Sequence, residues 1–210
     1  MTGSIVLVAL GMSLAASPSA APFGAVATAP LERGSLALYG MGGYPELRAG
    51  FREGMHGYEI GGEAGLDLRL FKFYGVLGAR LAALQSSRLR VSIDAQGGGF
   101  ASSGARWAEP LNERGAGLRL LLGSTLTYKT DWPLALTASL KAPLEVPLGE
   151  TGTTRLGLIL GGAAEIAIAP EYFLTFGGGF GPEFRRQLSR GESGTWLAVE
   201  AMVGFGYRMF

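Results

Sequence analysis

The stretch GYEIGGEAGLDLRL, residues 57–70, alternates between apolar and polar side chains over its whole length. Its even positions include Tyr58, Ile60, Leu66 and Leu68, whereas its odd positions carry three acids, three glycines and an arginine. Side chains that alternate with a period of two point to opposite faces of a β-strand. The stretch therefore predicts a long strand with one apolar face and one charged face.

The same alternation recurs along the rest of the chain. The six longest of the other alternating segments have 12 to 15 residues. A typical globular strand has about 5 to 6 residues, whereas a tilted strand needs roughly 9 to 11 to cross a bilayer. The segments cover residues 34–42, 46–53, 73–84, 88–95, 117–129, 134–146, 155–168, 172–184 and 195–209. We predict an all-β fold, a transmembrane antiparallel up-and-down β-barrel. It has ten strands if the short segments 46–53 and 88–95 are included, which we prefer, and eight if they are not.

Two kinds of connection join these segments. TDWP at 130–133 and APE at 169–171 are tight. Three other connections, at 96–115, 148–155 and 185–194, are longer, polar and rich in glycine. Bacterial outer-membrane barrels have short periplasmic turns and longer external loops, so the asymmetry gives the predicted barrel an orientation.

The composition excludes several classes of protein. Only 17% of the 210 residues are charged, against about 25% in soluble domains. The net charge of +1 offers no polycation for nucleic-acid binding. With no cysteine and one histidine, the chain has neither a disulfide framework nor a thiolate or multi-histidine metal site. We therefore expect no metal, no cofactor and no nucleic-acid partner.

The N-terminus is typical of an export signal. SIVLVALGMSLAA, residues 4–16, is an apolar core of signal-peptide length, and small residues and prolines follow it. Ala25-Val26-Ala27 fits the small-x-small cleavage pattern best. We expect a signal peptide at 1–27, with cleavage between residues 20 and 29, followed by a single barrel domain at 28–210. The alternative is a buried N-terminal segment.

Together, the export signal, the amphipathic strands, the turn asymmetry and the C-terminal VGFGYRMF (203–210) resemble the small outer-membrane β-barrel proteins of Gram-negative bacteria. The resemblance implies location in the outer membrane, contact with its lipid and lipopolysaccharide, and insertion by the barrel-assembly machinery, which reads such a C-terminal segment. We expect the barrel to be a monomer. This architecture hosts many functions, so it does not identify one.

The charged faces give the candidate site. A basic residue exposed to lipid at the midplane costs about 2 to 4 kcal/mol, so the charged faces should point into the lumen. Because acids and bases are balanced in number, they should pair there and close a narrow lumen. The acids of residues 57–70 should pair most readily with Arg80 and Arg119. The predicted lumen network comprises Glu59, Glu63, Asp67, Arg80, Arg90, Arg119, Lys141, Glu165 and Glu200.

Two further groups are expected at the membrane boundaries. An aromatic girdle at the periplasmic end would comprise Tyr128, Trp132, Tyr172, Tyr207 and Phe210. Arg185, Arg186 and Arg190 fall in one predicted external loop. Arginine forms bidentate contacts with phosphate, so lipopolysaccharide head groups could bind there.

The functional expectation is an integral outer-membrane protein with a closed lumen and a structural or interaction role, and not an enzyme. The first alternative is a small-solute channel of porin type. The second is a lipid-A-modifying hydrolase or acyltransferase that would use the single histidine, His56, which lies in a turn. A soluble periplasmic barrel of lipocalin type, with its faces reversed, is a further alternative.

Overall fold

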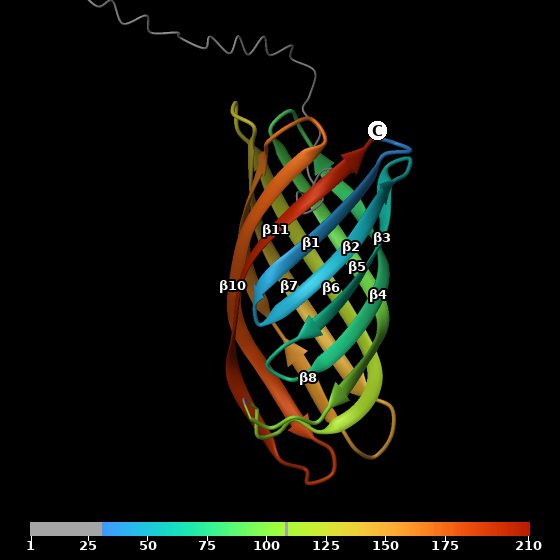
Figure 1. The fold of residues 1–210 in the computed structure, drawn as a ribbon, viewed down its shortest axis with the longest axis vertical. Coiled ribbons are helices and arrows are strands. Elements are labelled where there is room, and N and C mark those ends of the chain that lie inside the picture. The colour runs from blue at the N-terminus through green and yellow to red at the C-terminus, as the bar shows by residue number, and fades with distance from the viewer. Residues whose placement is uncertain (1–30, 108) are drawn as a thin grey trace, which may run out of the picture.

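The described part of the chain, residues 31–107 and 109–210 of a computed structural model, consists of β-strands and their connections. The predicted signal peptide lies outside these residues. None of the described residues forms a helix that is long and apolar enough to cross a membrane. The strands are β1 (Leu36–Tyr44), β2 (Glu46–Gly54), β3 (Tyr58–Asp67), β4 (Lys72–Gln85), β5 (Leu89–Ser103), β6 (Arg114–Lys129), β7 (Leu134–Pro147), β8 (Thr153–Gly157), β9 (Ile159–Ala167), β10 (Tyr172–Gln187) and β11 (Ser193–Met209) (Figure 1).

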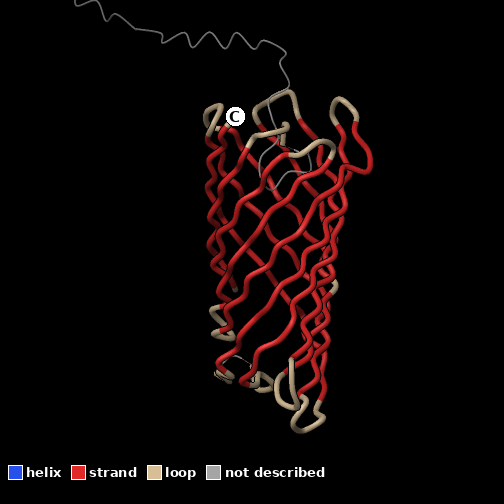
Figure 2. Tube along the Cα trace, turned by 90° about the vertical axis from the view of Figure 1, so that its right-hand side faces the viewer, coloured by secondary structure: helices blue, strands red, loops and turns tan. Residues whose placement is uncertain are grey.

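Every strand pairs antiparallel with its neighbours, and β1 pairs with β11, so the sheet closes into a barrel (Figures 1 and 2). β8 and β9 occupy one position, because both lie between β7 and β10. They correspond to the single segment predicted at 155–168. The prediction of a ten-strand up-and-down barrel is therefore confirmed, and the eight-strand alternative is wrong.

The break between β8 and β9 falls at Leu158, whose amide still donates to the carbonyl oxygen of Pro182 at 3.0 Å. Pro143 of β7 and Pro182 of β10 flank this point on the two neighbouring strands. A proline has no N–H to donate to a strand ladder. The pattern of inter-strand hydrogen bonds is interrupted at Leu158, where a proline lies on each neighbouring strand. The backbone nevertheless continues in the same direction from β8 into β9.

The two ends of the barrel differ. The connections at 55–57, 86–88, 130–133 and 168–171 lie at one end together with the C-terminus, and all are short (Figure 1). The opposite end carries the connections at 104–113, 148–152 and 188–192, along with two shorter ones at residue 45 and at 68–71. We call the first end periplasmic and the second external, following the usual arrangement of such barrels. His56 lies in a periplasmic turn and is exposed.

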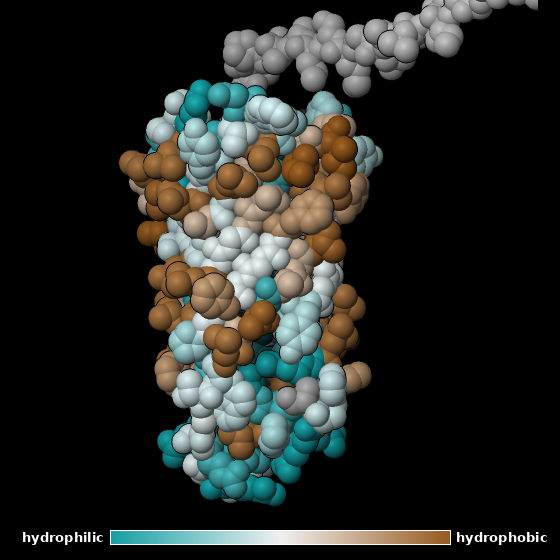
Figure 3. Space-filling model, turned by 90° about the vertical axis from the view of Figure 1, so that its left-hand side faces the viewer, coloured by the Kyte–Doolittle hydropathy of each residue, from teal (hydrophilic) through white to brown (hydrophobic). Residues whose placement is uncertain are grey.

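The strands alternate as the sequence predicts, with apolar side chains outside and charged ones inside. Leu77 and Leu197 are each 67% exposed and Leu122 is 61% exposed, all on the outer face. On the face shown in the space-filling view, hydrophobic side chains cover much of the barrel wall, and the external end is more hydrophilic (Figure 3). An apolar outside around a polar inside is the arrangement of a transmembrane barrel, the reverse of a lipocalin. The lipocalin alternative is therefore wrong.

Strands β5 and β10 extend into segments that the sequence had suggested were loops. β5 continues to Ser103 and takes in the glycines at 97–99, which the sequence had suggested were part of a loop. The reason is a close approach: a Cβ at Gly98 would clash with the carbonyl oxygen of Gly75 on β4. The glycines therefore allow tight strand packing inside a narrow barrel. β10 likewise continues to Gln187, two residues beyond Arg185.

Candidate functional site

The lumen contains all nine residues predicted for the charge network. Each lies on the inward face of its strand. Glu59, Asp67, Arg80 and Glu165 are buried, and the other five are partly buried. Contacts in the lumen form a periplasmic tier that includes Glu59 and Arg80, an external tier that includes Arg119, and a middle group around Glu63. Several residues outside the predicted set complete these groups.

The periplasmic tier joins two arginines with two acids. Arg80 donates from Nε to Oδ1 of Asp94 at 2.6 Å, and its Nη1 lies 3.7 Å from Glu59. Arg52 lies 3.8 Å from Glu59 and 4.0 Å from Asp94. The Leu31 amide donates to the Glu59 carboxylate at 2.7 Å.

Leu31 also closes this end of the lumen with apolar contacts. Its side chain is 3% exposed and belongs to one buried cluster. The cluster consists of Leu31, Ala37, Tyr39, Met41, Phe173 and Met202. Leu31 therefore lies in the periplasmic mouth rather than outside it.

In the middle of the lumen, Glu63 accepts a hydrogen bond from the Tyr39 hydroxyl at 3.0 Å and lies 3.8 Å from Arg48. The Tyr74 hydroxyl is 2.8 Å from a Glu46 oxygen and 3.2 Å from a Glu63 oxygen. Its single proton can serve only one carboxylate at a time. Glu63 thus contacts Arg48 and the Tyr39 hydroxyl, and it shares the Tyr74 hydroxyl with Glu46.

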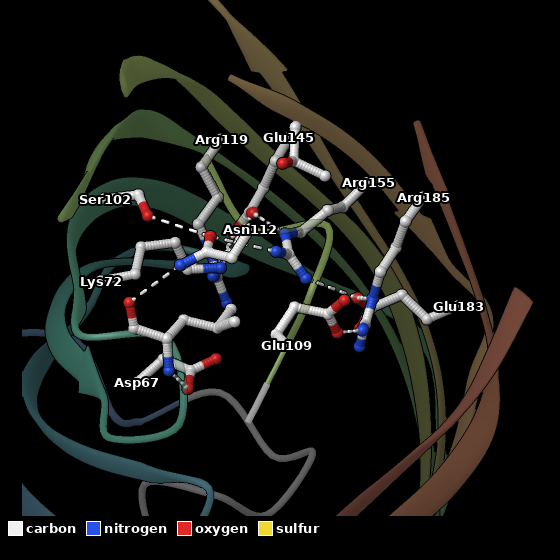
Figure 4. Close-up of polar contacts among 12 residues, drawn as sticks. Asp67, Lys72, Ser102, Glu109, Asn112, Arg119, Glu145, Arg155, Glu183 and Arg185 are labelled. Carbon is white, nitrogen blue, oxygen red and sulfur yellow. Dashed lines mark hydrogen bonds and ion pairs between the residues drawn. The ribbon is translucent and has the colours of Figure 1, made fainter. Parts of the chain in front are cut away.

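The external tier is centred on Glu145 (Figure 4). Lys72 lies 2.6 Å from Glu145, Arg119 2.7 Å and Arg155 3.7 Å. The three cations come from β4, β6 and β8, and Glu145 comes from β7. Arg155 also contacts Glu183 at 3.1 Å. One buried carboxylate therefore joins four strands.

The external mouth is covered by the connection at 104–113, which lies across the end of the barrel (Figures 1 and 4). Glu109 forms an ion pair with Arg185, and both side chains are almost completely buried. Asn112 accepts hydrogen bonds from Ser102 at 3.1 Å and from Arg155 at 3.3 Å. These contacts attach the connection to β5, β8 and β10.

Glu113 anchors the same connection to two neighbouring ones. Its carboxylate accepts hydrogen bonds from the Gly152 amide at 2.8 Å, from the Gln187 side chain at 2.8 Å and from the Ser189 hydroxyl. Burial acts to raise the pKa of the Glu113 carboxyl, but these hydrogen bonds outweigh it and hold the pKa below its usual value. The ionised carboxylate thus ties together three external connections.

Two of the cavities among the described residues lie inside the barrel. The larger, about 140 Å³, lies between the two tiers and is bordered by Arg48, Glu63 and Tyr74 on one side and by small residues such as Ala163 and Gly177 on the other. The smaller, about 60 Å³, lies in the external half near Lys72 and Glu145. The described residues include no group of three or more His, Asp or Glu side chains placed to hold a metal ion.

Some pairings differ from the expectation. Arg119 contacts Glu145 and, at 3.7 Å, Glu46, rather than the acids of β3. Asp67 pairs with Arg69 of its own turn at 3.7 Å. The sequence predicted where the strands lie and which side chains point inward. It did not predict which side chains lie opposite one another across the lumen, so these ion-pair partners could not be assigned. It also left out Arg48, Arg52, Lys72, Asp94, Glu109, Glu145, Arg155, Glu183 and Arg185 from the network, although most of them share the parity of the inward faces.

The structure places the five girdle residues together at the periplasmic end. Trp132 is 78% exposed in the turn between β6 and β7, and Phe210 is 65% exposed at the C-terminus. The rings of Tyr172 and Tyr207 lie on the outer surface with centroids 5.1 Å apart. Tyr128 is exposed near the end of β6.

The three arginines expected in an external loop separate into two groups. Arg186 and Arg190 are exposed at the external end. Arg185 is not in a loop, because β10 extends past it and its side chain points into the lumen, where it is 2% exposed and lies over the ring of Trp196. The expectation that Arg185 contacts lipopolysaccharide was therefore wrong.

No protein-family model matches the chain, and no curated protein sequence matches it. Several solved structures have a similar shape. The outer membrane protease OmpT from Escherichia coli is 9% identical, with a TM-score of 0.42, over 83% of this chain and 96% of OmpT. KdgM porin, solved in complex with disordered oligogalacturonate, is 9% identical, with a TM-score of 0.45, over 84% of this chain and 99% of the porin. The siderophore receptor PirA from Pseudomonas aeruginosa is 15% identical, with a TM-score of 0.41, over 86% of this chain and 37% of the receptor.

Proposed function

We propose that the protein is an integral outer-membrane β-barrel whose lumen is closed at rest, with a structural or interaction role at the cell envelope and no catalytic activity. One observation carries the proposal: ion pairs join strands that are not neighbours. Lys72 of β4 reaches Glu145 of β7, Arg119 of β6 reaches Glu46 of β2, and Lys141 of β7 reaches Glu200 of β11 at 3.4 Å. Such pairs cross the lumen rather than line it.

Both ends of the lumen support the same proposal. Leu31 and its apolar cluster fill the periplasmic mouth, and the connection at 104–113 covers the external one. An open selective pore would instead carry a ring of charges of one sign. Acids and bases alternate around this lumen, which favours a packed interior over a conducting one.

A bilayer conductance measurement tests the proposal. The detergent-extracted protein should show a heat-dependent mobility shift on a gel, which reports the folded barrel, and no steady channel openings in a planar bilayer. Steady openings would overturn the closed-lumen proposal and favour the second candidate, a small-solute channel. The specific observation behind that candidate is the cavity of about 140 Å³ between the tiers.

The absence of catalysis is part of the proposal. His56 is exposed in a periplasmic turn and forms no hydrogen bond or ion pair with another of the described residues. General-base catalysis requires the histidine within about 3 Å of the group it activates. Deacylation of lipid A, or acyl transfer to it, that is lost in His56→Ala would contradict this part.

The exposed outer surface supports contact with lipopolysaccharide. Arg186 and Arg190 lie at the external end, where β10 leaves the apolar band. Guanidinium groups there can form bidentate contacts with lipid phosphates. We propose that the mature chain is inserted by the barrel-assembly machinery and works as a monomer.

A further inference from the structure

The two cavities in the lumen lie next to each other and share part of their lining. Ala163 and Gly177 border only the larger cavity, whereas Ala198 and Arg155 border only the smaller one. Five residues, which come from β2, β6, β7, β9 and β11, border both cavities: Glu46, Arg119, Pro143, Ile159 and Glu200. These strands are distributed around the barrel. The five residues therefore form a ring that separates the two cavities.

Two ion pairs cross the lumen at this ring. Arg119 of β6 lies 3.7 Å from Glu46 of β2. Lys141 of β7, which borders the larger cavity, lies 3.4 Å from Glu200 of β11. Arg119 is held by a second acid, because it also pairs with Glu145 at 2.7 Å (Figure 4). Lys141 and Glu200 differ from it, since within the described part of the chain each is the other's only ion-pair partner.

The Lys141–Glu200 pair is also more accessible to water than the other pairs that cross the lumen. Its side chains are 30% and 23% exposed, against 5% and 4% for Lys72 and Glu145. Water and dissolved ions screen an accessible ion pair, so such a pair contributes little to stability. Breaking a buried pair is costly by comparison. The Lys141–Glu200 pair can therefore separate while the Lys72–Glu145 pair stays intact.

The wall behind the Lys141–Glu200 pair is built from the smallest residues. Glu200 is in register with Gly179 of β10, and Gly179 is in register with Gly161 of β9. Both glycines lie on the inward faces of their strands. The side chains of Lys141 and Glu200 thus cross a part of the lumen into which these two positions of β9 and β10 send no side chain.

We propose that Lys141 and Glu200 form a gate between the two cavities. The ring is closed while the two side chains are paired. When they separate, the cavities join along the glycines of β9 and β10, and a small hydrated solute can pass from one cavity to the other. Because dissolved ions weaken the pair, ionic strength regulates the gate. The inference rests on the proposed closed lumen and identifies the point at which that lumen opens.

Cysteine accessibility tests the gate, because the chain has no cysteine of its own. Ala163→Cys places a thiol at the larger cavity, and Ala198→Cys places one at the smaller cavity. Each variant is treated in detergent with iodoacetamide, a small uncharged reagent, and alkylation of the full chain is followed by mass spectrometry. The gate should limit the thiol that reacts more slowly. Raising the salt concentration from about 0.05 M to about 1 M should increase that slower rate at least about tenfold.

Substitutions at the pair should have the same effect without salt. Lys141→Met and Glu200→Ala, each in the cysteine backgrounds, should raise the slower rate at least about tenfold at low salt and abolish the further rise at high salt. Combining Lys141→Glu with Glu200→Lys restores an ion pair and should restore the slow rate. Glu192→Ala is the matched control, because it removes the same charge at an exposed position before β11, and it should leave both rates unchanged. A retained heat-dependent mobility shift shows that each variant is folded.

The outcomes distinguish the gate from the closed lumen. If both thiols react as fast as free cysteine while Lys141 and Glu200 are intact, the lumen is open and both proposals fail. If a thiol reacts slowly, and its rate changes neither with salt nor in the folded Lys141→Met and Glu200→Ala variants, the lumen is closed but this pair is not its gate.

Discussion

Lys72 and Glu145 lie on β4 and β7, with two strands between them, yet the Lys72 ammonium is 2.6 Å from the Glu145 carboxylate. The pair spans the lumen, and both side chains are about 95% buried. Arg119 and Arg155 contact the same carboxylate. Ion pairs across the lumen therefore stabilise the interior of this barrel. The free energy of unfolding should depend on a few carboxylates that each contact several cations.

Glu145→Gln should destabilise the barrel by about 3 to 5 kcal/mol, the usual cost of breaking a buried pair. The substitution leaves three buried cations without their common carboxylate. Urea unfolding of the protein in detergent, followed on a gel by the heat-dependent mobility shift, measures the effect. Glu150→Gln is the matched control, because Glu150 is exposed in the turn between β7 and β8. A loss below about 1 kcal/mol for Glu145→Gln would show that the cations find other partners.

Glu63→Leu should lower the heat resistance of the barrel in detergent. The change leaves Arg48 without its ion-pair partner and leaves the Tyr39 hydroxyl without its acceptor. Each unsatisfied buried group costs about 1 to 3 kcal/mol. Glu63→Gln, which keeps an acceptor oxygen, should lose less. If Glu63→Leu instead opened a steady conductance while the barrel stayed folded, Glu63 would be part of a gate.

Acidification should release the external connections at 104–113, 148–152 and 188–192. The pKa of Glu113 is lowered from its ordinary value of 4.5 in the folded protein. Its contribution to stability is therefore fully present above about pH 4.5 and is lost as the pH falls through the lower folded value. The protection of residues 104–113 against hydrogen exchange, taken relative to the intrinsic exchange rate at each pH, should fall below about pH 4.5 in the wild type. In Glu113→Gln the protection of the same residues should already be low at neutral pH. A pH profile of protection in this variant that matches that of the wild type would contradict the role of the carboxylate.

Gly98→Ala and Gly75→Ala should differ sharply, although the two glycines lie on adjacent strands. A Cβ at position 98 would meet the carbonyl oxygen of Gly75, whereas a Cβ at position 75 would meet nothing within 4 Å. We expect Gly98→Ala to cost about 1 to 3 kcal/mol through overpacking and Gly75→Ala to be neutral or stabilising by up to about 1 kcal/mol. Urea unfolding in detergent measures both. Equal effects would mean that β4 and β5 can move apart at low cost.

The sequence by itself predicted the barrel and the inward direction of the charges, and it favoured ten strands over eight. Period-two alternation does this because each side chain's face depends only on its place along its own strand, as in residues 57–70. The same local rule placed Glu59, Glu63 and Asp67 inside. It also predicted that connection length would distinguish the two ends.

Only the tertiary structure decided which charged side chains form ion pairs and how far each strand extends. The partners of Glu145 come from β4, β6 and β8, and such contacts depend on the register and the tilt of all strands together. Arg185 was expected in an external loop but points into the lumen. The reason is that hydrogen bonds to β11 continue β10 beyond the point where its polar sequence had suggested a loop. β1 pairs with only the C-terminal part of β11, from Ala201 to Met209, because β1 is much shorter. This is a relation between strands at opposite ends of the chain, which no local pattern contains.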